Sequence, residues 1–151
     1  MSIYNKIKVA VIGATGYTGL DLVLMLSKHP KISIKYLCAT KNLGKSIKFF
    51  DKRINKNLPK ISPVNKIDLY KLDLIFLSLP NGEAQKLIKK YFFKNKRLKF
   101  IDLSADFRIL NFKTYEKNYK LKHKAKKLVK HSLYSIPELN KEIINKFRII
   151  S

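Results

Sequence analysis

The residues whose types and spacing could do chemistry begin with a glycine-rich segment near the N-terminus. Gly13, Gly16 and Gly19 follow the pattern G-x-x-G-x-x-G and are three of the five glycines in the chain. They lie between an apolar, β-branched run at residues 7–12 and a helical pattern at residues 15–28. There the first glycine permits a tight turn, the second lets backbone approach a pyrophosphate, and the third lets the helix pack on the strand. We therefore predict a dinucleotide-phosphate site, with a plain strand-to-helix turn as the alternative.

The end of the second predicted strand, at residues 32–39, indicates which dinucleotide would bind. A carboxylate at this place would accept from the ribose 2′-hydroxyl and select NAD. The chain has Thr40 and Lys41 here instead, and both can donate to a 2′-phosphate. The sequence therefore predicts NADP rather than NAD. The alternative is that Lys41 is one of many surface lysines.

Further candidate residues follow the third and fourth predicted strands. In open α/β sheets, ligands bind beyond the carboxyl ends of the strands. Those ends carry residues 80–82 and then Ser104, Asp106 and Arg108. Arg108 is one of only four arginines, and a planar guanidinium suits a phosphate or a carboxylate. The alternative is an ion pair with Asp106 that holds the loop.

The cysteine and the histidines offer no convincing chemical centre. Cys38 is the only cysteine, which excludes a disulfide scaffold and a cysteine-cluster zinc site. It lies inside a predicted strand, where a buried thiol is usually an inert small hydrophobe. His29, His123 and His131 have no partners spaced for a metal or a catalytic triad. No catalytic and no metal-ligating residue is predicted.

The elements that must position these residues alternate along the chain. Strands are expected at residues 7–12, 32–39, 72–79 and 98–103, with a last one starting at 148; helices are expected at 15–28, 83–93 and 137–146. Residues 40–63 are expected to be mostly loop, and residues 113–130 a helix or an insertion. Alternating strands and helices predict a Rossmann-like, doubly wound α/β fold with a mostly parallel sheet. We expect residues 1–151 to form one such domain.

The charge balance raises a different class of function. Lys and Arg number 33 against 10 acids, giving a net charge of +23, which is typical of nucleic-acid-binding proteins. However, the lysines are spread along the whole chain and arginine is scarce, which favours compositional bias over a polyanion site. A basic nucleic-acid-binding module stays the alternative, with residues 113–130 its densest segment. No apolar run is long enough to span a bilayer, so we expect a cytoplasmic protein without a membrane partner.

Four segments, in order along the chain, resemble a known family. They are residues 13–19 (GATGYTG), 79–82 (LPNG), 101–108 (IDLSADFR) and 134–140 (YSIPELN). Together they are similar to the N-acetyl-γ-glutamyl-phosphate reductases of arginine biosynthesis. The last two segments argue against the related aspartate-semialdehyde dehydrogenases, which stay an alternative.

The resemblance implies an NADPH-dependent reductive dephosphorylation of an acyl phosphate to a semialdehyde. The residues it implies for the cofactor are Gly13, Ala14, Thr15, Gly16, Tyr17, Thr18, Thr40, Lys41, Pro80 and Gly82, and for the substrate Ser104 and Arg108. Asn81 departs from the histidine typical of the family. A homo-oligomer is implied for the full-length protein.

The resemblance places the family's cysteine nucleophile just after Ser151 and its histidine in a second, catalytic and dimerisation domain. We therefore expect the 151 residues to be the NADP-binding part, ending before the nucleophile and inactive alone. An NADP sensor without chemistry is a further alternative.

Overall fold

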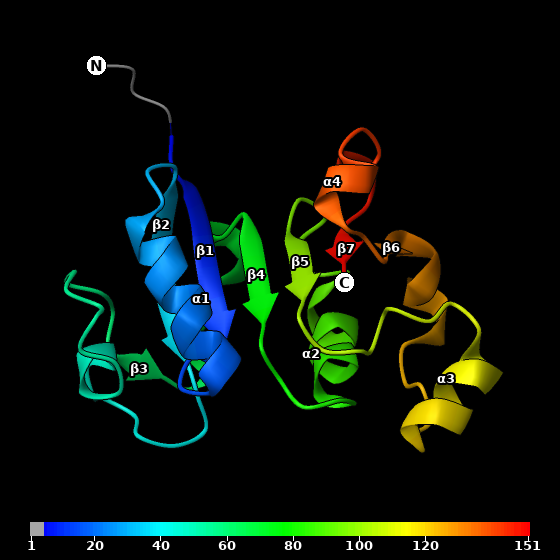
Figure 1. Ribbon diagram of the computed structural model, residues 1–151, viewed down its shortest axis with the longest axis horizontal. Coiled ribbons are helices and arrows are strands. Elements are labelled where there is room, and N and C mark those ends of the chain that lie inside the picture. The colour runs from blue at the N-terminus through cyan, green and yellow to red at the C-terminus, as the bar shows by residue number, and fades with distance from the viewer. Residues whose placement is uncertain (1–4) are drawn as a thin grey trace. The chain divides into compact units, whose positions relative to one another are not determined.

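The computed structural model describes residues 5–151, which form two compact units. The first unit ends at Ser78 and the second spans Leu79–Ser151. Each unit contains parallel strands alternating with helices (Figure 1). The predicted alternation of strands and helices is therefore confirmed within each unit.

The first unit is built on four parallel strands. Its elements are β1 (Ile7–Ile12), α1 (Tyr17–Lys28), β2 (Ile32–Cys38), β3 (Ile61–Ser62) and β4 (Leu74–Leu77), with 3-10 helices at Ile47–Phe49, Val64–Lys66 and Leu69–Lys71. The strand order is β3-β2-β1-β4, and every pairing is parallel. Helix α1 lies across one face of this sheet, in front of β1 and β2 (Figure 1).

The apolar run of β1 is explained by its place between two neighbours. Val9 pairs with Ile34 of β2 on one side and with Leu74 of β4 on the other. From Val9 to Ile12 every side chain is buried. A central parallel strand is covered on both faces, so its sequence is continuously apolar and does not alternate.

The second unit contains three parallel strands and three α-helices. Its elements are α2 (Glu83–Tyr91), β5 (Lys99–Asp102), α3 (Phe112–Tyr119), β6 (Ser132–Leu133), α4 (Pro137–Asn140) and β7 (Ile149–Ile150), with 3-10 helices at Lys126–His131 and Ile144–Lys146. The strand order is β5-β7-β6. The largest fully buried side chains of this unit are Tyr115, Phe100, Phe107, Ile88 and Leu98.

Two short strands were not predicted from the sequence. Ile61 and Ser62 form β3, which pairs with β2 inside the segment expected to be mostly loop. Residues Ser132–Leu133 form β6, which pairs with β7. A strand of two residues is too short to show a period in its side chains, so these strands depend on their partners.

The predicted helical segments are shorter or divided in the structure. The segment 113–130 contains α3, which ends before Lys120 in the left-handed region at φ 54°, and a separate 3-10 helix from Lys126. The helix expected at 137–146 divides into α4 and a 3-10 helix. Helix α1 begins at Tyr17 rather than at residue 15, because Gly16 is its extended N-cap residue.

None of the helices formed by residues 5–151 combines the length and the apolar character needed to cross a bilayer.

Candidate functional site

The glycine loop (residues 13–19) is held at the carboxyl end of β2. Gly13 lies in the left-handed region at φ 85°, which favours glycine. The backbone N–H groups of Gly13 and Ala14 both donate to the Cys38 carbonyl oxygen, at 2.9 and 3.0 Å. The chain therefore turns sharply after β1 while it stays bonded to the neighbouring strand.

The other two glycines of this loop have different structural reasons. A Cβ atom on Gly19 would lie 2.0 Å from the Gly13 carbonyl oxygen, so only glycine fits where α1 packs on the turn. A Cβ on Gly16 would lie 3.5 Å from the same oxygen, which is an ordinary contact. Gly16 is exposed, so its missing side chain leaves the backbone open to a ligand.

The N-terminus of α1 is suited to an anion. Its N-cap residue Gly16 supplies no side-chain cap, and its first turn contains no acid. The first N–H groups of a helix have no partner within the helix, and they carry partial positive charge. Tyr17 and Thr18 are exposed at this end, with Tyr17 95% accessible, and Thr15 is half-buried. Backbone N–H groups and side-chain hydroxyls at this end of α1 are therefore accessible to an anion.

The β2 loop (residues 39–46) contains the residues predicted to select the cofactor. Thr40 and Lys41 are exposed, and the sequence places no carboxylate in this loop. Its shape is fixed by Asn42 and Gly44, both in the left-handed region, and by a 2.8 Å hydrogen bond from the Gly44 N–H to the Ile61 carbonyl. The short strand β3 therefore holds the far end of this loop.

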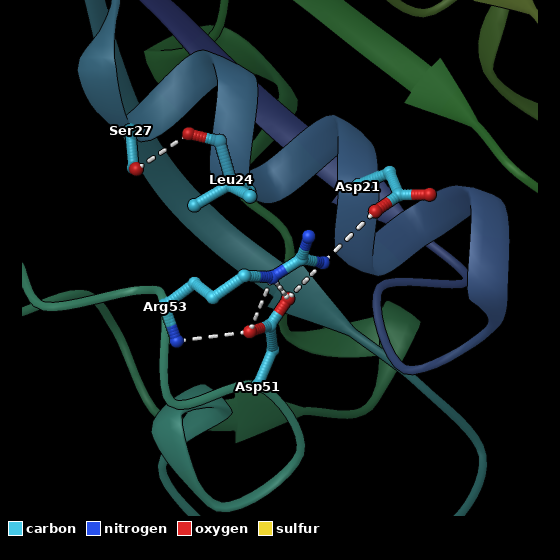
Figure 2. Close-up of polar contacts among 5 residues, drawn as sticks. All are labelled: Asp21, Leu24, Ser27, Asp51 and Arg53. Carbon is cyan, nitrogen blue, oxygen red and sulfur yellow. Dashed lines mark hydrogen bonds and ion pairs between the residues drawn. The ribbon is translucent and has the colours of Figure 1, made fainter.

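Arg53 ties the segment after this loop to α1. Its guanidinium bonds both carboxylate oxygens of Asp51 and reaches Asp21 of α1 at 3.1 Å, as Figure 2 shows. The Asp51 hydrogen bonds hold the pKa of Arg53 above its usual range. The contact restrains residues 51–53, which follow the β2 loop and the 3-10 helix at Ile47–Phe49. Asp21 and Arg53 are both largely exposed, so the restraint is geometric rather than a large stabilisation.

In the second unit, Asp106 is the centre of a buried polar cluster. Its carboxylate accepts from the Gly82 N–H with both oxygens, at 2.8 and 2.9 Å, and from the Gln85 N–H at 3.1 Å. The Tyr115 hydroxyl donates to it at 2.7 Å. Among the described residues of this unit, Asp106 and Arg108 do not form an ion pair. The alternative of an Asp106–Arg108 ion pair is therefore wrong.

The 80–82 turn precedes α2. Gly82 is the N-cap residue of α2 at φ 88°, in the left-handed region. Pro80 and Asn81 are exposed, and the Asn81 side-chain oxygen accepts from the Ala105 N–H at 3.3 Å. Asn81, which departs from the family's typical histidine, therefore fastens this turn to the segment after β5.

Ser104 and Arg108 lie in different environments after β5. Ser104 is buried, and its hydroxyl oxygen accepts from the Asp106 N–H at 3.2 Å. Arg108 is exposed and donates to the Leu103 carbonyl at 3.4 Å. The hydroxyl therefore shapes the turn, whereas the guanidinium reaches solvent and is open to an anion.

Asp102 ends β5 with one carboxylate oxygen bonded and the other without a partner. Oδ1 accepts from the Ser104 N–H at 2.9 Å, whereas buried Oδ2 has no hydrogen-bond partner among the described residues. Burial raises the pKa of Asp102 to about 6, against the opposing effect of the Ser104 hydrogen bonds. Desolvation of a charge with an incomplete set of donors has this direction.

Cys38 and His123 both have structural surroundings. Cys38 is fully buried with its Sγ 3.8 Å from the Ser62 hydroxyl, and burial raises the pKa of its thiol. The ring of His123 is buried and bonds the Asp106 carbonyl and the Ala125 N–H, and burial lowers its pKa. The prediction of a buried Cys38 is confirmed. Within residues 5–151 no group of three His, Cys, Asp or Glu side chains could hold a metal ion.

The cluster around Asp106 was not predicted from the sequence. The sequence indicates Asp106 as a residue at a strand end and as a possible partner of Arg108, but it does not indicate Gln85 or Tyr115. The signal available was Gly82 directly before a helical pattern without a Ser, Thr, Asp or Asn N-cap. A helix start without its own cap needs acceptors from elsewhere in the chain.

The sequence matches the family described as semialdehyde dehydrogenase, NAD binding domain, over residues 8–147. It is 40% identical over 148 residues to N-acetyl-gamma-glutamyl-phosphate reductase of Ehrlichia ruminantium, and 38% identical over 146 residues to that of Campylobacter jejuni. Each alignment covers 97% of this chain but only 42% of the relative. The chain thus spans less than half the length of these relatives.

Solved structures agree with the fold. Aspartate semialdehyde dehydrogenase II of Vibrio cholerae has a TM-score of 0.67 at 21% identity, covering 97% of this chain and 41% of that one. Aspartate semialdehyde dehydrogenase with NADP from Candida albicans has a TM-score of 0.53 at 26% identity, covering 69% and 31%. The predicted Rossmann-like α/β class is confirmed. The chain belongs to the semialdehyde dehydrogenase family, a family of nicotinamide-dependent oxidoreductases, and carries its NAD-binding domain.

Proposed function

We propose that this chain is the cofactor-binding part of a reductase that converts N-acetyl-γ-glutamyl phosphate to the semialdehyde with NADPH. The observation that carries the proposal is the glycine loop in front of an α1 N-terminus that no side chain caps. The identity of 38–40% to reductases of that name supports the choice of substrate. The bound nicotinamide would supply the hydride, and the chain's own residues would bind and orient the dinucleotide.

The cofactor residues divide by the part of the dinucleotide they would hold. Gly13, Ala14, Thr15, Gly16, Tyr17 and Thr18 would surround the pyrophosphate. The exposed backbone at Gly16 and the free first turn of α1 support this assignment, because both present N–H donors to an anion. Pro80 and Gly82 would contact the nicotinamide ribose.

We propose that the cofactor is NADP. Thr40 and Lys41 are exposed on a loop without a carboxylate, so nothing there would repel a 2′-phosphate. The Candida albicans structure, at 26% identity, was solved with NADP, which supports the same choice. The loop geometry at Asn42 and Gly44 gives these two side chains a fixed starting position.

The substrate assignment is the acyl phosphate, with Ser104 and Arg108 beside it. Arg108 gives the strongest support for a phosphate-containing substrate. Its guanidinium is exposed, and its hydrogen bond to the Leu103 carbonyl is long, at 3.4 Å, so an anion could replace it. Ser104 would act through the turn it shapes. The homo-oligomer of the full-length protein stays a prediction of the resemblance, and the cytoplasmic location stays a prediction of the composition.

The test is a fluorescence titration of the purified chain with NADPH and, in parallel, NADH. We expect saturable binding with NADPH preferred by tenfold or more, about 1.4 kcal/mol. Lys41→Glu should abolish that preference, whereas Lys96→Glu, which makes the same charge change at an exposed turn, should keep it. Failure to bind either cofactor would contradict the proposal. Tight oligonucleotide binding with a steep salt slope would instead favour the nucleic-acid-binding alternative.

A further inference from the structure

The N-termini of α1 and α2 are built in opposite ways. Helix α1 begins without a side-chain cap. Helix α2 also begins at a glycine, Gly82, but its first N–H groups are bonded by the Asp106 carboxylate from another segment. Positive charge at a helix N-terminus attracts anions. At α2 that place is already filled by an anion belonging to the protein.

Burial and hydrogen bonds fix the position of the Asp106 carboxylate. Its side chain is fully buried, as are Gln85 and Tyr115 beside it. The Gln85 amide nitrogen donates to the Tyr115 hydroxyl at 3.2 Å, and that hydroxyl donates to Asp106 at 2.7 Å. The Tyr115 hydroxyl therefore holds the carboxylate directly, and Gln85 holds that hydroxyl in place.

A histidine fixes the backbone of the same residue. The Nε2 of His123 lies 2.8 Å from the Asp106 carbonyl oxygen, and its Nδ1 accepts from the Ala125 N–H at 3.2 Å. Because Nδ1 accepts, Nε2 must carry the proton and donate to Asp106. The Lys124 N–H donates to the Gln85 side-chain oxygen, which joins the segment after α3 to the start of α2.

We propose that Asp106 is a positioning residue for the nicotinamide half of the cofactor. It fixes the 80–82 turn through Gly82 and closes the α2 N-terminus to phosphate, so that the dinucleotide's phosphates bind at α1 alone. The inference rests on the proposed function, which assigns Pro80 and Gly82 to the nicotinamide ribose. Asn81 supports it, because its bond to the Ala105 N–H fastens the same turn to the segment that carries Asp106.

The test compares the binding of two ligands that share the adenosine half of the dinucleotide. NADPH has both halves of the dinucleotide, whereas adenosine 2′,5′-bisphosphate has only the adenosine half. The residues assigned to that half all lie in the first unit, and Asp106 lies in the second. Asp106→Asn keeps the shape of the side chain but turns an acceptor into a donor that faces an N–H group. We expect it to weaken NADPH binding about tenfold and to leave the bisphosphate unchanged, as loss of a charged hydrogen bond predicts.

Two further variants separate positioning from general damage. Glu83→Gln removes an exposed acid from the first turn of the same helix, where Glu83 pairs with Lys86, and should leave NADPH affinity unchanged. Tyr115→Phe removes one hydrogen bond from Asp106 while it keeps the buried ring, and should weaken NADPH binding by a smaller factor in the same direction. If Asp106→Asn does not fold, Tyr115→Phe decides the question with the same pair of ligands.

Amide hydrogen exchange gives a direct reading of the cap. The Gly82 and Gln85 amides should be protected in the wild-type chain and should exchange faster in Asp106→Asn, while the Phe92 amide stays protected by Ile88. Equal NADPH affinity in wild type and both variants would overturn the inference and leave the proposed function standing. A wild-type chain that binds neither ligand would instead overturn the proposed function, whatever the exchange rates show.

Discussion

The guanidinium of Arg148 donates to the Phe92 carbonyl at 2.9 Å and lies 3.9 Å from the centre of the Phe92 ring. It also donates to the carbonyls of Asn95 and Leu98, at 2.7 and 3.0 Å. A cation therefore occupies the C-terminus of α2, whose N-terminus is occupied by Asp106. Both charges have the sign that the helix dipole favours, and both come from elsewhere in the chain.

Replacing Arg148 by lysine should destabilise the protein although the charge is kept. Lysine has no planar fork, so it cannot bond three carbonyls and stack on the Phe92 ring together. We expect a loss of about 2 kcal/mol in the free energy of unfolding, measured by urea denaturation. Arg97→Lys, at an exposed side chain, is the matched control. Equal midpoints for the two variants would show that a point charge is enough at the end of α2.

The glycines of the glycine loop should respond differently to alanine. Gly19→Ala places a Cβ 2.0 Å from the Gly13 carbonyl oxygen, so the variant should unfold at lower temperature or fail to fold. Gly16→Ala makes only an ordinary contact, at a φ of −76°, and should keep its melting temperature. It should nevertheless lose NADPH affinity, because the methyl group covers backbone assigned to the pyrophosphate. Calorimetry and a cofactor titration on both variants would separate the two roles, and a Gly16→Ala variant that binds NADPH normally would contradict this assignment.

Asp102 should make stability depend on pH in an unusual direction for a carboxylate. Its pKa is raised to about 6, mainly by burial, so the folded state favours the protonated form. The resulting penalty is absent below the unfolded pKa near 4 and is complete above about pH 6. Asp102→Asn should therefore stabilise the protein at pH 7.5, by about 3 kcal/mol at most, and much less at pH 4.

Urea unfolding of the Asp102→Asn variant at these two pH values measures this difference. Glu142→Gln, at an exposed acid, should show no such change with pH. A variant that is less stable than wild type at pH 7.5 would mean that the charged carboxylate finds donors that the structure does not show.

Cys38 should behave as a core residue and not as a nucleophile. Its side chain is fully buried and its thiol pKa is raised, so little thiolate forms at neutral pH. A water-soluble disulfide reagent should react only as fast as the chain unfolds, and Cys38→Ala should keep its NADPH affinity. Rapid stoichiometric labelling of the native chain would contradict this expectation.

The local features of the proposed cofactor site could be predicted from the sequence. A glycine triplet after a β-branched run requires a turn, an open backbone and a close helix, and the structure has all three at Gly13, Gly16 and Gly19. The buried strands could also be predicted from the sequence, because a central parallel strand is apolar at every position. These features depend on residues within a few positions of one another, so a linear pattern contains them.

Only the tertiary structure decided what surrounds the ends of α2. Asp106 and Arg148 bond a helix that lies about 20 and 60 positions earlier in the chain, and hydrogen bonds over such separations leave no period in the sequence. The same holds for β3 and β6, which are too short to be strands without their neighbours. The sequence by itself determined the family and the glycine loop; the folded chain decided which charges occupy the helix ends, because a buried backbone group takes its partner from whichever segment the fold brings beside it.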